Sequence, residues 1–343
     1  MEKQIKRKEN KKEKYASMLL LLFLTVVMLV TATYAWFTSN KTVTISTLDV
    51  NVEATSGLQI SADGFNWKSV LTNADLAGAH LAGPGSYLGS TNQIPLVMEP
   101  VSTAGIISAG KMNMFSGVVL DDNGDFALSS TQLTDARGAS GSYIVFDVFL
   151  KTEDDKDIYL STNSGVTAKA LTLDIGLKNA ARIGFLLPYA TTESVSVPSD
   201  SALSSIQGQV PDKAFIWEPN FDVHTANGVA AALQVYGITT TTTGASAIPY
   251  DGVKAAIASA TPIILPETNA TDNPTYFQTV NPSYKTPANY ASALNYIKVF
   301  KLSRGITKVR VYMWVEGQDV DCENNASGSD LSFNIQFSIE PTP

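Results

Sequence analysis

Apolar and polar residues alternate with a period of two along much of this chain. The clearest case lies near the C-terminus, where Leu331, Phe333, Ile335 and Phe337 alternate with serine, asparagine and glutamine. Successive side chains of a β-strand point to opposite faces, so this pattern predicts a strand with one buried and one solvated face. Patterns of helical period are short and few. The chain is therefore expected to fold into β-sheets.

Several other segments predict strands. The segment 309–315 has one aliphatic and one amphipathic face. The run YIVFDVFL at 143–150 is apolar on both sides, as expected for a central strand that is packed on two faces. Further strands are predicted at 171–177, 183–187, 214–217 and 296–302.

Polar turns and a shortage of helices define the fold class. Turn signals are Asp-Gly at 63–64 and 251–252 and Asn-Gly at 123–124. Short alanine-rich helices are predicted at 228–236 and 253–260. Many short strands with few helices predict an all-β fold, an antiparallel β-sandwich.

The length suggests an addition to this sandwich. We expect residues 36–187 and 291–340 to build the sandwich domain. The stretch 188–290 is rich in proline, carries the threonine run 239–243 and has few alternating segments. It is predicted to be a long, partly helical insertion, with a small subdomain as the alternative.

Composition argues against several function classes. The chain has 343 residues, of which 44% are hydrophobic and 16% charged, which is unlike a disordered protein. A single cysteine excludes a disulfide scaffold or a cysteine-rich zinc module. The two histidines, His80 and His224, lie in no His-Glu-x-x-His motif, and no Gly-x-Ser-x-Gly motif is present. We therefore expect no enzymatic activity.

The net charge of −8 is unevenly distributed. Residues 1–35 contain seven lysines and arginines and three glutamates, a balance of +4. The remaining residues hold 24 − 7 = 17 basic and 32 − 3 = 29 acidic groups, a balance of −12. Such an acidic body has no basic face with which to neutralise phosphates, so nucleic-acid binding is not expected.

The basic N-terminus predicts an export signal. A charged stretch ends at Lys14, residues 16–30 are apolar, and small and polar residues follow to position 35. This order defines a secretory signal peptide at 1–35 that a signal peptidase cleaves between Ala35 and Trp36. The alternative is an uncleaved membrane anchor, which would be the protein's only contact with the membrane. Either way the body is expected to be secreted, extracellular or on the cell surface.

Two segments carry a resemblance. They are TATYAWFTSNKTVTISTLDVNVEA at 31–54 and VYMWVEGQDVDCENNASGSDLSFNIQFS at 311–338. Both resemble the TasA/camelysin-like exported proteins of Gram-positive bacteria, which carry a SipW-type signal peptide and have uncharacterised clostridial relatives. The resemblance covers the first 60 and the last 45 residues. It implies secretion, a β-sandwich of jelly-roll type and assembly into fibres of the biofilm matrix.

The first strand after the predicted cleavage site bears on assembly. Apolar residues fall on odd positions at Val43 and Ile45 and on even positions at Leu48, Val50 and Val52, a change of phase that a β-bulge would produce. This strand can pair within its own sheet as an ordinary edge strand. Alternatively, it can leave and complete the sheet of a neighbouring copy. Repeated exchange of this kind does not close on itself and builds a homo-oligomeric fibre.

An acidic segment near the C-terminus is a candidate metal site. Asp319, Asp321 and Glu323 lie close together, and dense carboxylates can hold Ca²⁺, although the spacing is not that of an EF-hand. The alternative is a solvated loop between two strands. No other cofactor is expected.

A second function stays open at this stage. A monomeric cell-surface adhesin or binding module could use exposed aromatic residues of the 188–290 region to bind a ligand. Burial of the same residues in the core is the simpler alternative. The residues concerned are Trp217, Tyr236, Tyr276, Phe277, Tyr284 and Tyr290.

Overall fold

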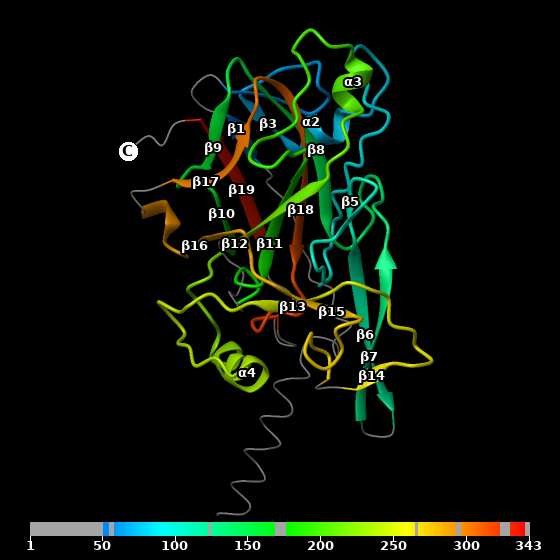
Figure 1. Cartoon of the computed structure of the whole chain (residues 1–343), viewed down its shortest axis with the longest axis vertical. Helices are drawn as coiled ribbons and strands as arrows, with labels where there is room; N and C mark the ends of the chain where they lie inside the picture. Colours follow the sequence, from blue (N-terminus) through cyan, green and yellow to red (C-terminus); the bar gives the residue numbers. More distant parts are fainter. Residues whose placement is uncertain are drawn as a thin grey trace, which may run out of the picture.

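The fold is all-β, as the alternating pattern predicts (Figure 1). This computed structural model describes residues 51–54, 58–122, 125–168, 176–264, 267–292, 296–322 and 330–339. Two six-stranded sheets share a hydrophobic core, and smaller sheets and short helices surround them. The pairing of strands does not by itself establish jelly-roll connectivity, which stays a prediction.

One six-stranded sheet, here called the terminal sheet, contains the first and the last described strands. Its order is β17-β9-β19-β1-β3, and β10 also pairs with β19. All its pairs are antiparallel except β1 with β19, which is parallel. The strands are β1 (Asn51–Ala54), β3 (Val70–Leu71), β9 (Lys156–Leu160), β10 (Gly165–Ala168), β17 (Ile297–Leu302) and β19 (Leu331–Ser338).

The other six-stranded sheet, here called the central sheet, has the order β16-β12-β11-β18-β8-β2. Its pairs are antiparallel except β12 with β16. The strands are β2 (Gln59–Ser61), β8 (Ile144–Thr152), β11 (Ala181–Leu187), β12 (Lys213–Pro219), β16 (Tyr284–Thr286) and β18 (Gly305–Val315).

The main core lies between these two sheets. The four alternating apolar residues of β19 are fully buried, and its intervening polar residues are half-buried up to Gln336, which confirms the predicted period. Across the core, the ring centroids of Phe185 on β11 and Phe337 on β19 lie 5.5 Å apart, edge to face. On β18, Val309, Val311 and Met313 face the same core. Burial of such side chains is the main source of the fold's stability.

The opposite face of the central sheet is also buried. Tyr312 and Trp314 of β18 pack there with residues of the loop at 101–104 and of β5, β6, β13 and β15. Near the other end, Ile206 of α3 covers the sheet. All eleven residues of β18 are consequently buried. The covering elements are β4 (Ile107–Ser108), β5 (Lys111–Met112), β6 (Met114–Asp122), β7 (Asp125–Leu133), β13 (Tyr250–Val253), β14 (Ile263–Ile264), β15 (Phe277–Val280) and α3 (Leu203–Gln207).

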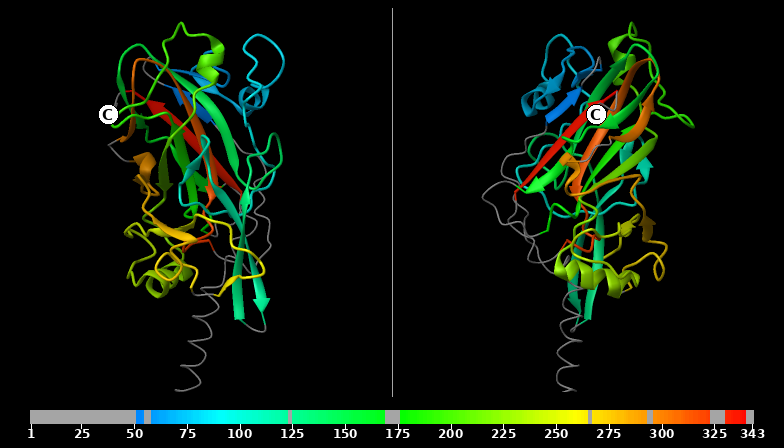
Figure 2. Two further views of the ribbon diagram at one scale, coloured as in Figure 1. Left: turned by 45° about the vertical axis from the view of Figure 1, so that its right-hand side comes forward. Right: turned by 90° about the vertical axis from the view of Figure 1, so that its left-hand side faces the viewer.

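The hairpin of β6 and β7 extends beyond the sandwich in all three views (Figures 1 and 2). Its register places Asp122 opposite Asp125, on either side of the predicted Asn-Gly turn at 123–124. The turn itself lies outside the described residues, as does most of the strand predicted at 171–177.

The region 188–290 is divided between the sandwich and its covering. Its strands β12 and β16 belong to the central sheet, and β12 includes the strand predicted at 214–217. The remaining helices are short and are α2 (Asn73–Gly78), η1 (Tyr290–Ser292) and α4 (Ala226–Tyr236), which confirms the helix predicted at 228–236. No helix of the described ranges is long and apolar enough to cross a membrane.

Two local predictions in this region are wrong. Asp251 and Gly252 do not form a turn but lie within β13, where a side chain at position 252 would overlap the carbonyl of Thr103. The helix predicted at 253–260 is absent from these described residues. Instead, Ile257 exchanges backbone hydrogen bonds with Ser130 of β7, so tertiary pairing overrides the helix propensity of the alanines.

Burial of the central sheet on both faces places charges in the interior. Asp147 of β8 and Arg310 of β18 are direct cross-strand neighbours. The Arg310 Nε lies 2.7 Å from Asp147 Oδ1, and its Nη2 lies 3.0 Å from Oδ2. The Tyr87 hydroxyl donates a third hydrogen bond to this carboxylate at 2.6 Å. The pKa of Asp147 is lowered: burial acts to raise it, but the charge and hydrogen bonds of Arg310 outweigh burial.

We expect Asp147→Ala to lower the free energy of unfolding by about 3–5 kcal/mol, because Arg310 is left buried without a counter-charge. Urea denaturation measures the change. Asp157→Ala is the matched control. It removes an ion pair of similar length, in which Asp157 Oδ2 lies 2.8 Å from Nζ of the exposed Lys298. This control is expected to change stability little. Equal effects of the two substitutions would contradict the role given to the buried pair.

Candidate functional site

The N-terminal strand β1 lies inside the terminal sheet, between β19 and β3. It runs parallel to β19, with Asn51 opposite Asn334 and Ala54 opposite Phe337. On its other edge it pairs with the two residues of β3. Of the residues predicted to exchange, Val52 lies in β1. Val43, Ile45, Leu48 and Val50 lie outside the described residues, as do Ala35 and Trp36 of the predicted cleavage site.

The contact between β1 and β19 is not imposed by a local turn. Antiparallel neighbours such as β6 and β7 are joined by two residues, so they pair within one chain. β1 and β19, by contrast, lie at opposite ends of the described chain. Their pairing is made by main-chain hydrogen bonds, which do not depend on which copy supplies β1.

The edge of β19 that faces β1 is longer than β1. β1 pairs with residues 334–337, whereas β19 begins at Leu331. Along 331–333 this edge has no strand partner among the described residues, while β10 pairs with the other edge over 331–334. In the same parallel register, residues 331–333 lie opposite positions 48–50, which are outside the described residues.

The acidic segment after β18 is tied to the body by ion pairs. Asp319 contacts the guanidinium of Arg182 on β11, and the same guanidinium lies 2.7 Å from Glu218 on β12. Asp321 accepts a hydrogen bond from the backbone N–H of Thr225, the N-cap of α4, at 2.8 Å, and lies 2.7 Å from Nδ1 of His224. The loop is thereby fastened to two strands and a helix.

These pairings bear on the predicted metal site. Asp319 and Asp321 lie near each other, and the Asp321 N–H donates to Asp319 Oδ1 at 2.8 Å. Each carboxylate already has a basic partner, and the described residues contain no group of three His, Cys, Asp or Glu side chains arranged for a metal ion. Glu323 lies outside these ranges. Calcium binding by the three residues stays a prediction.

The pKa values of Glu316, Asp321 and His224 are all raised, those of the two carboxyl groups by burial. Burial raises the pKa of Glu316, which follows β18, to about 7, although Trp314 Nε1 and the Gln318 N–H donate hydrogen bonds to it at 2.9 and 3.1 Å. Burial also raises the pKa of Asp321. For His224, burial lowers the pKa, but the hydrogen bond and charge of Asp321 outweigh burial and raise it. The cluster therefore changes charge as the pH falls.

The aromatic residues of 188–290 do not form an exposed surface. Three of the six are buried, with 0% exposure for Trp217, 1% for Phe277 and 4% for Tyr290. Tyr236, Tyr276 and Tyr284 are half-buried. These six residues thus contribute mainly to packing, and the binding-module alternative loses the surface on which it was based.

Sequence reasoning missed the basic and acidic partners of the loop. Arg182, Glu218 and His224 carry no motif, and the signal available was weak: Arg182 and Glu218 interrupt apolar strands at positions that face away from the main core. Their partners lie on other elements and are brought together only by the folded sheets. No family model, curated protein or solved structure matches the chain.

We expect the stability of the protein to fall between pH 4.5 and 7 because of Glu316. The folded pKa of about 7 exceeds the ordinary value of 4.5. The folded state therefore binds the proton more tightly, and stability that is fully present below pH 4.5 is lost as the pH rises through 7. The loss is on the order of 3 kcal/mol.

Urea denaturation at pH 5 and pH 8 checks this expectation. In Glu316→Gln the side chain cannot ionise, so the variant should lose less stability over this interval than the wild type. Other groups, including His224 and Asp321, titrate in both proteins and cancel in the comparison. Parallel pH dependence of the two proteins would contradict the assignment to Glu316.

Proposed function

We propose that this protein is an exported structural protein, a subunit of an extracellular surface or biofilm-matrix fibre that assembles by exchange of its N-terminal strand. The observation that supports this proposal is the parallel pairing of β1 with β19 inside the terminal sheet. The strand that a signal peptidase would leave near the new N-terminus is the strand that completes this sheet.

The local interactions of β19 are compatible with this assembly. The same backbone groups of β19 are satisfied when β1 comes from the same chain or from a neighbour, so the local interactions are retained on exchange. The difference in free energy then comes from chain entropy and from new contacts between subunits. When each copy donates its strand to one neighbour and accepts a strand from another, the interface is heterologous, and an assembly that does not close grows into a filament.

The short connection after β1 constrains the geometry. Four residues, 55–58, separate Ala54 of β1 from Gln59 of β2. An extended chain of this length spans about 14 Å. A donated β1 therefore brings its own body into direct contact with the accepting body. Such subunits would form a stiff fibre rather than a flexible string.

Fibre formation is the first test. The exported wild-type protein is expected to form fibres that negative-stain electron microscopy detects. Removing 36–50 leaves every described strand in place but removes four of the five predicted exchange residues. This variant is expected to fold, as shown by circular dichroism, and to remain monomeric. Fibres of normal length from the deletion variant, or no fibres from the wild type, would contradict the proposal.

Disulfide trapping separates exchange from pairing within one chain. The register places Glu53 opposite Gln336. In a background in which Cys322 is serine, Glu53→Cys and Gln336→Cys are made as separate variants and mixed during assembly. A cross-linked dimer on a non-reducing gel is expected only if β1 of one copy pairs with β19 of another. Thr241→Cys, at an exposed position, replaces Gln336→Cys in the control mixture. Absence of the specific cross-link in assembled protein would overturn strand exchange.

A further inference from the structure

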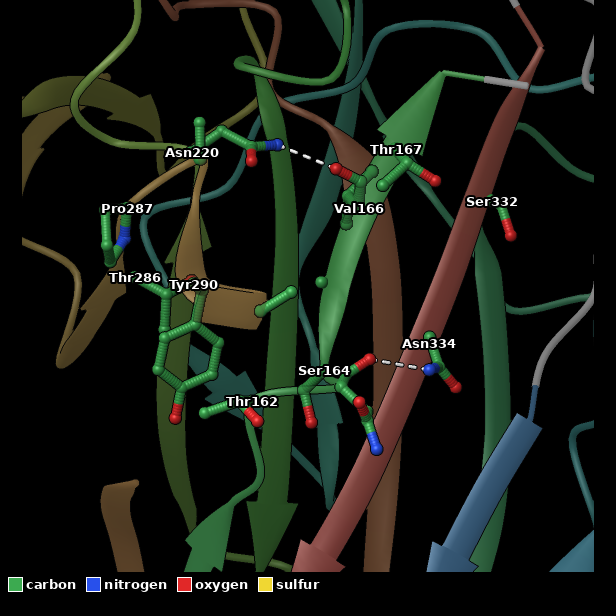
Figure 3. A pocket seen from close by; sticks show the side chains of 14 residues that line it. Thr162, Ser164, Val166, Thr167, Asn220, Thr286, Pro287, Tyr290, Ser332 and Asn334 are labelled. Atoms are coloured by element: carbon green, nitrogen blue, oxygen red, sulfur yellow. Dashed lines mark hydrogen bonds between the residues drawn. The ribbon is translucent and has the colours of Figure 1, made fainter. Parts of the chain in front are cut away.

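A cavity of about 350 Å³ lies between β10 and the segment 286–291, at the edge of the terminal sheet (Figure 3). This volume falls at the lower end of the range of small-molecule sites. The cavity is separate from the place where β1 pairs with β19, because β10 and β1 pair with opposite edges of β19. It plays no part in the proposed strand exchange.

An irregularity in strand pairing creates the floor of the cavity. Leu160 is opposite Phe337 and Gly165 is opposite Asn334, so the four residues 161–164 face only two residues of β19. Gln336 fixes this bulge: its carbonyl accepts from the Ser161 N–H, and its N–H donates to Ser164 Oγ, both at 2.9 Å. Bulges are frequent beside functional sites, where they redirect side chains.

Asn220 presents a fixed hydrogen-bond acceptor to the cavity. Its residue is 93% buried, with 7% exposure, and its Nδ2 donates to the carbonyls of Val166 and Lys178 at 2.9 and 3.1 Å. These two acceptors determine the orientation of the amide. Its Oδ1 has no partner among the described residues, and Figure 3 shows this oxygen turned away from the Val166 carbonyl. Asn220 also has a φ of +61°, a left-handed conformation that is uncommon outside glycine.

The same amide argues against a peptide strand as the ligand. The Val166 carbonyl points to the outer edge of β10, where an added strand would need it as an acceptor. Asn220 already occupies that acceptor. Blocking an exposed edge in this way prevents strand addition. A small molecule can use the cavity without displacing Asn220.

The chemistry of the lining points to a neutral ligand rich in hydroxyl groups. The lining residues are serine, threonine, asparagine, glycine, alanine, valine and proline, with one tyrosine, and none carries a formal charge at neutral pH. A charged ligand would find no counter-ion among them. Hydroxyl and amide side chains such as Thr162 and Asn334 donate and accept, as the hydroxyl groups of a sugar require.

Tyr290 is buried and fixes one side of the cavity. Its hydroxyl donates to the Leu160 carbonyl at 2.6 Å and accepts from the Ile297 N–H at 3.0 Å. These bonds hold the ring in place beside the cavity (Figure 3). With 4% exposure, Tyr290 gives the wall its shape, and the polar groups named above are the ones that can contact a ligand. We infer that the cavity between β10 and residues 286–291 is a binding site for a neutral carbohydrate.

The test uses the exported protein purified after expression with its own leader. Glucose, galactose, N-acetylglucosamine and its β-1,4-linked disaccharide are the neutral probes, and glucuronate and glucose 6-phosphate are the charged ones. Saturation-transfer NMR and calorimetry measure binding at millimolar concentrations. At least one neutral probe is expected to bind saturably, with an affinity at least tenfold higher than that of either charged probe.

Two variants locate the binding. Asn220→Gly keeps the left-handed backbone conformation but removes the acceptor, and Thr162→Tyr fills the cavity. Each is expected to weaken binding at least tenfold. Thr131→Tyr, at an exposed threonine of β7, is the matched control and should bind normally. The inference is overturned if no neutral probe binds, if charged probes bind as well, or if folded Thr162→Tyr keeps wild-type affinity.

Discussion

Burial of the central sheet on both faces is the constraint on which the rest of this structure depends. An antiparallel sheet commonly has one solvated face, but here all eleven residues of β18 are buried. Polar side chains on the second face must therefore find partners inside the protein. Asp147 and Arg310 do so across two adjacent strands, and Arg182 and Glu218 do so on β11 and β12. Each pair is expensive to break, so together they select one arrangement of the covering segments.

These charge pairs also connect the sandwich to its periphery. Arg182 reaches Asp319 in the loop after β18, and Asp321 of the same loop reaches His224 and the first turn of α4. The loop precedes β19 in sequence, and β19 is the strand that receives β1. The polar network thus anchors the segment that precedes β19 in the chain. The proposed fibre subunit relies on this combination of an anchored body and one strand that joins it by sheet pairing.

The sequence predicts the sheets well and the periphery poorly. Alternation identifies β18 and β19, because the inward side of a strand recurs every two residues whatever its partner is. The run that is apolar on both sides identifies β8. The helix expected at 253–260 fails because the backbone of Ile257 pairs with Ser130, which is distant in sequence. For the candidate assembly site, the N-terminal strand could be predicted because its residues have a local alternating pattern. Its parallel pairing with β19 could not be predicted, because no local pattern encodes it. The proposed carbohydrate cavity carries no sequence signal, because it arises from a mismatch in length between residues 161–164 and their partners on β19.

By itself, the sequence determined the all-β class, the position of the main strands and the inward face of each, since these follow from local periodicity. Tertiary structure alone decided that the amphipathic face of β18 is buried and that Arg310 pairs with Asp147. It also decided that β12 and β16 join the central sheet and that Asp319 and Asp321 bind basic side chains. The reason is physical: periodicity records whether a side chain is buried, but the identity of its neighbour depends on strand register between segments far apart in the chain.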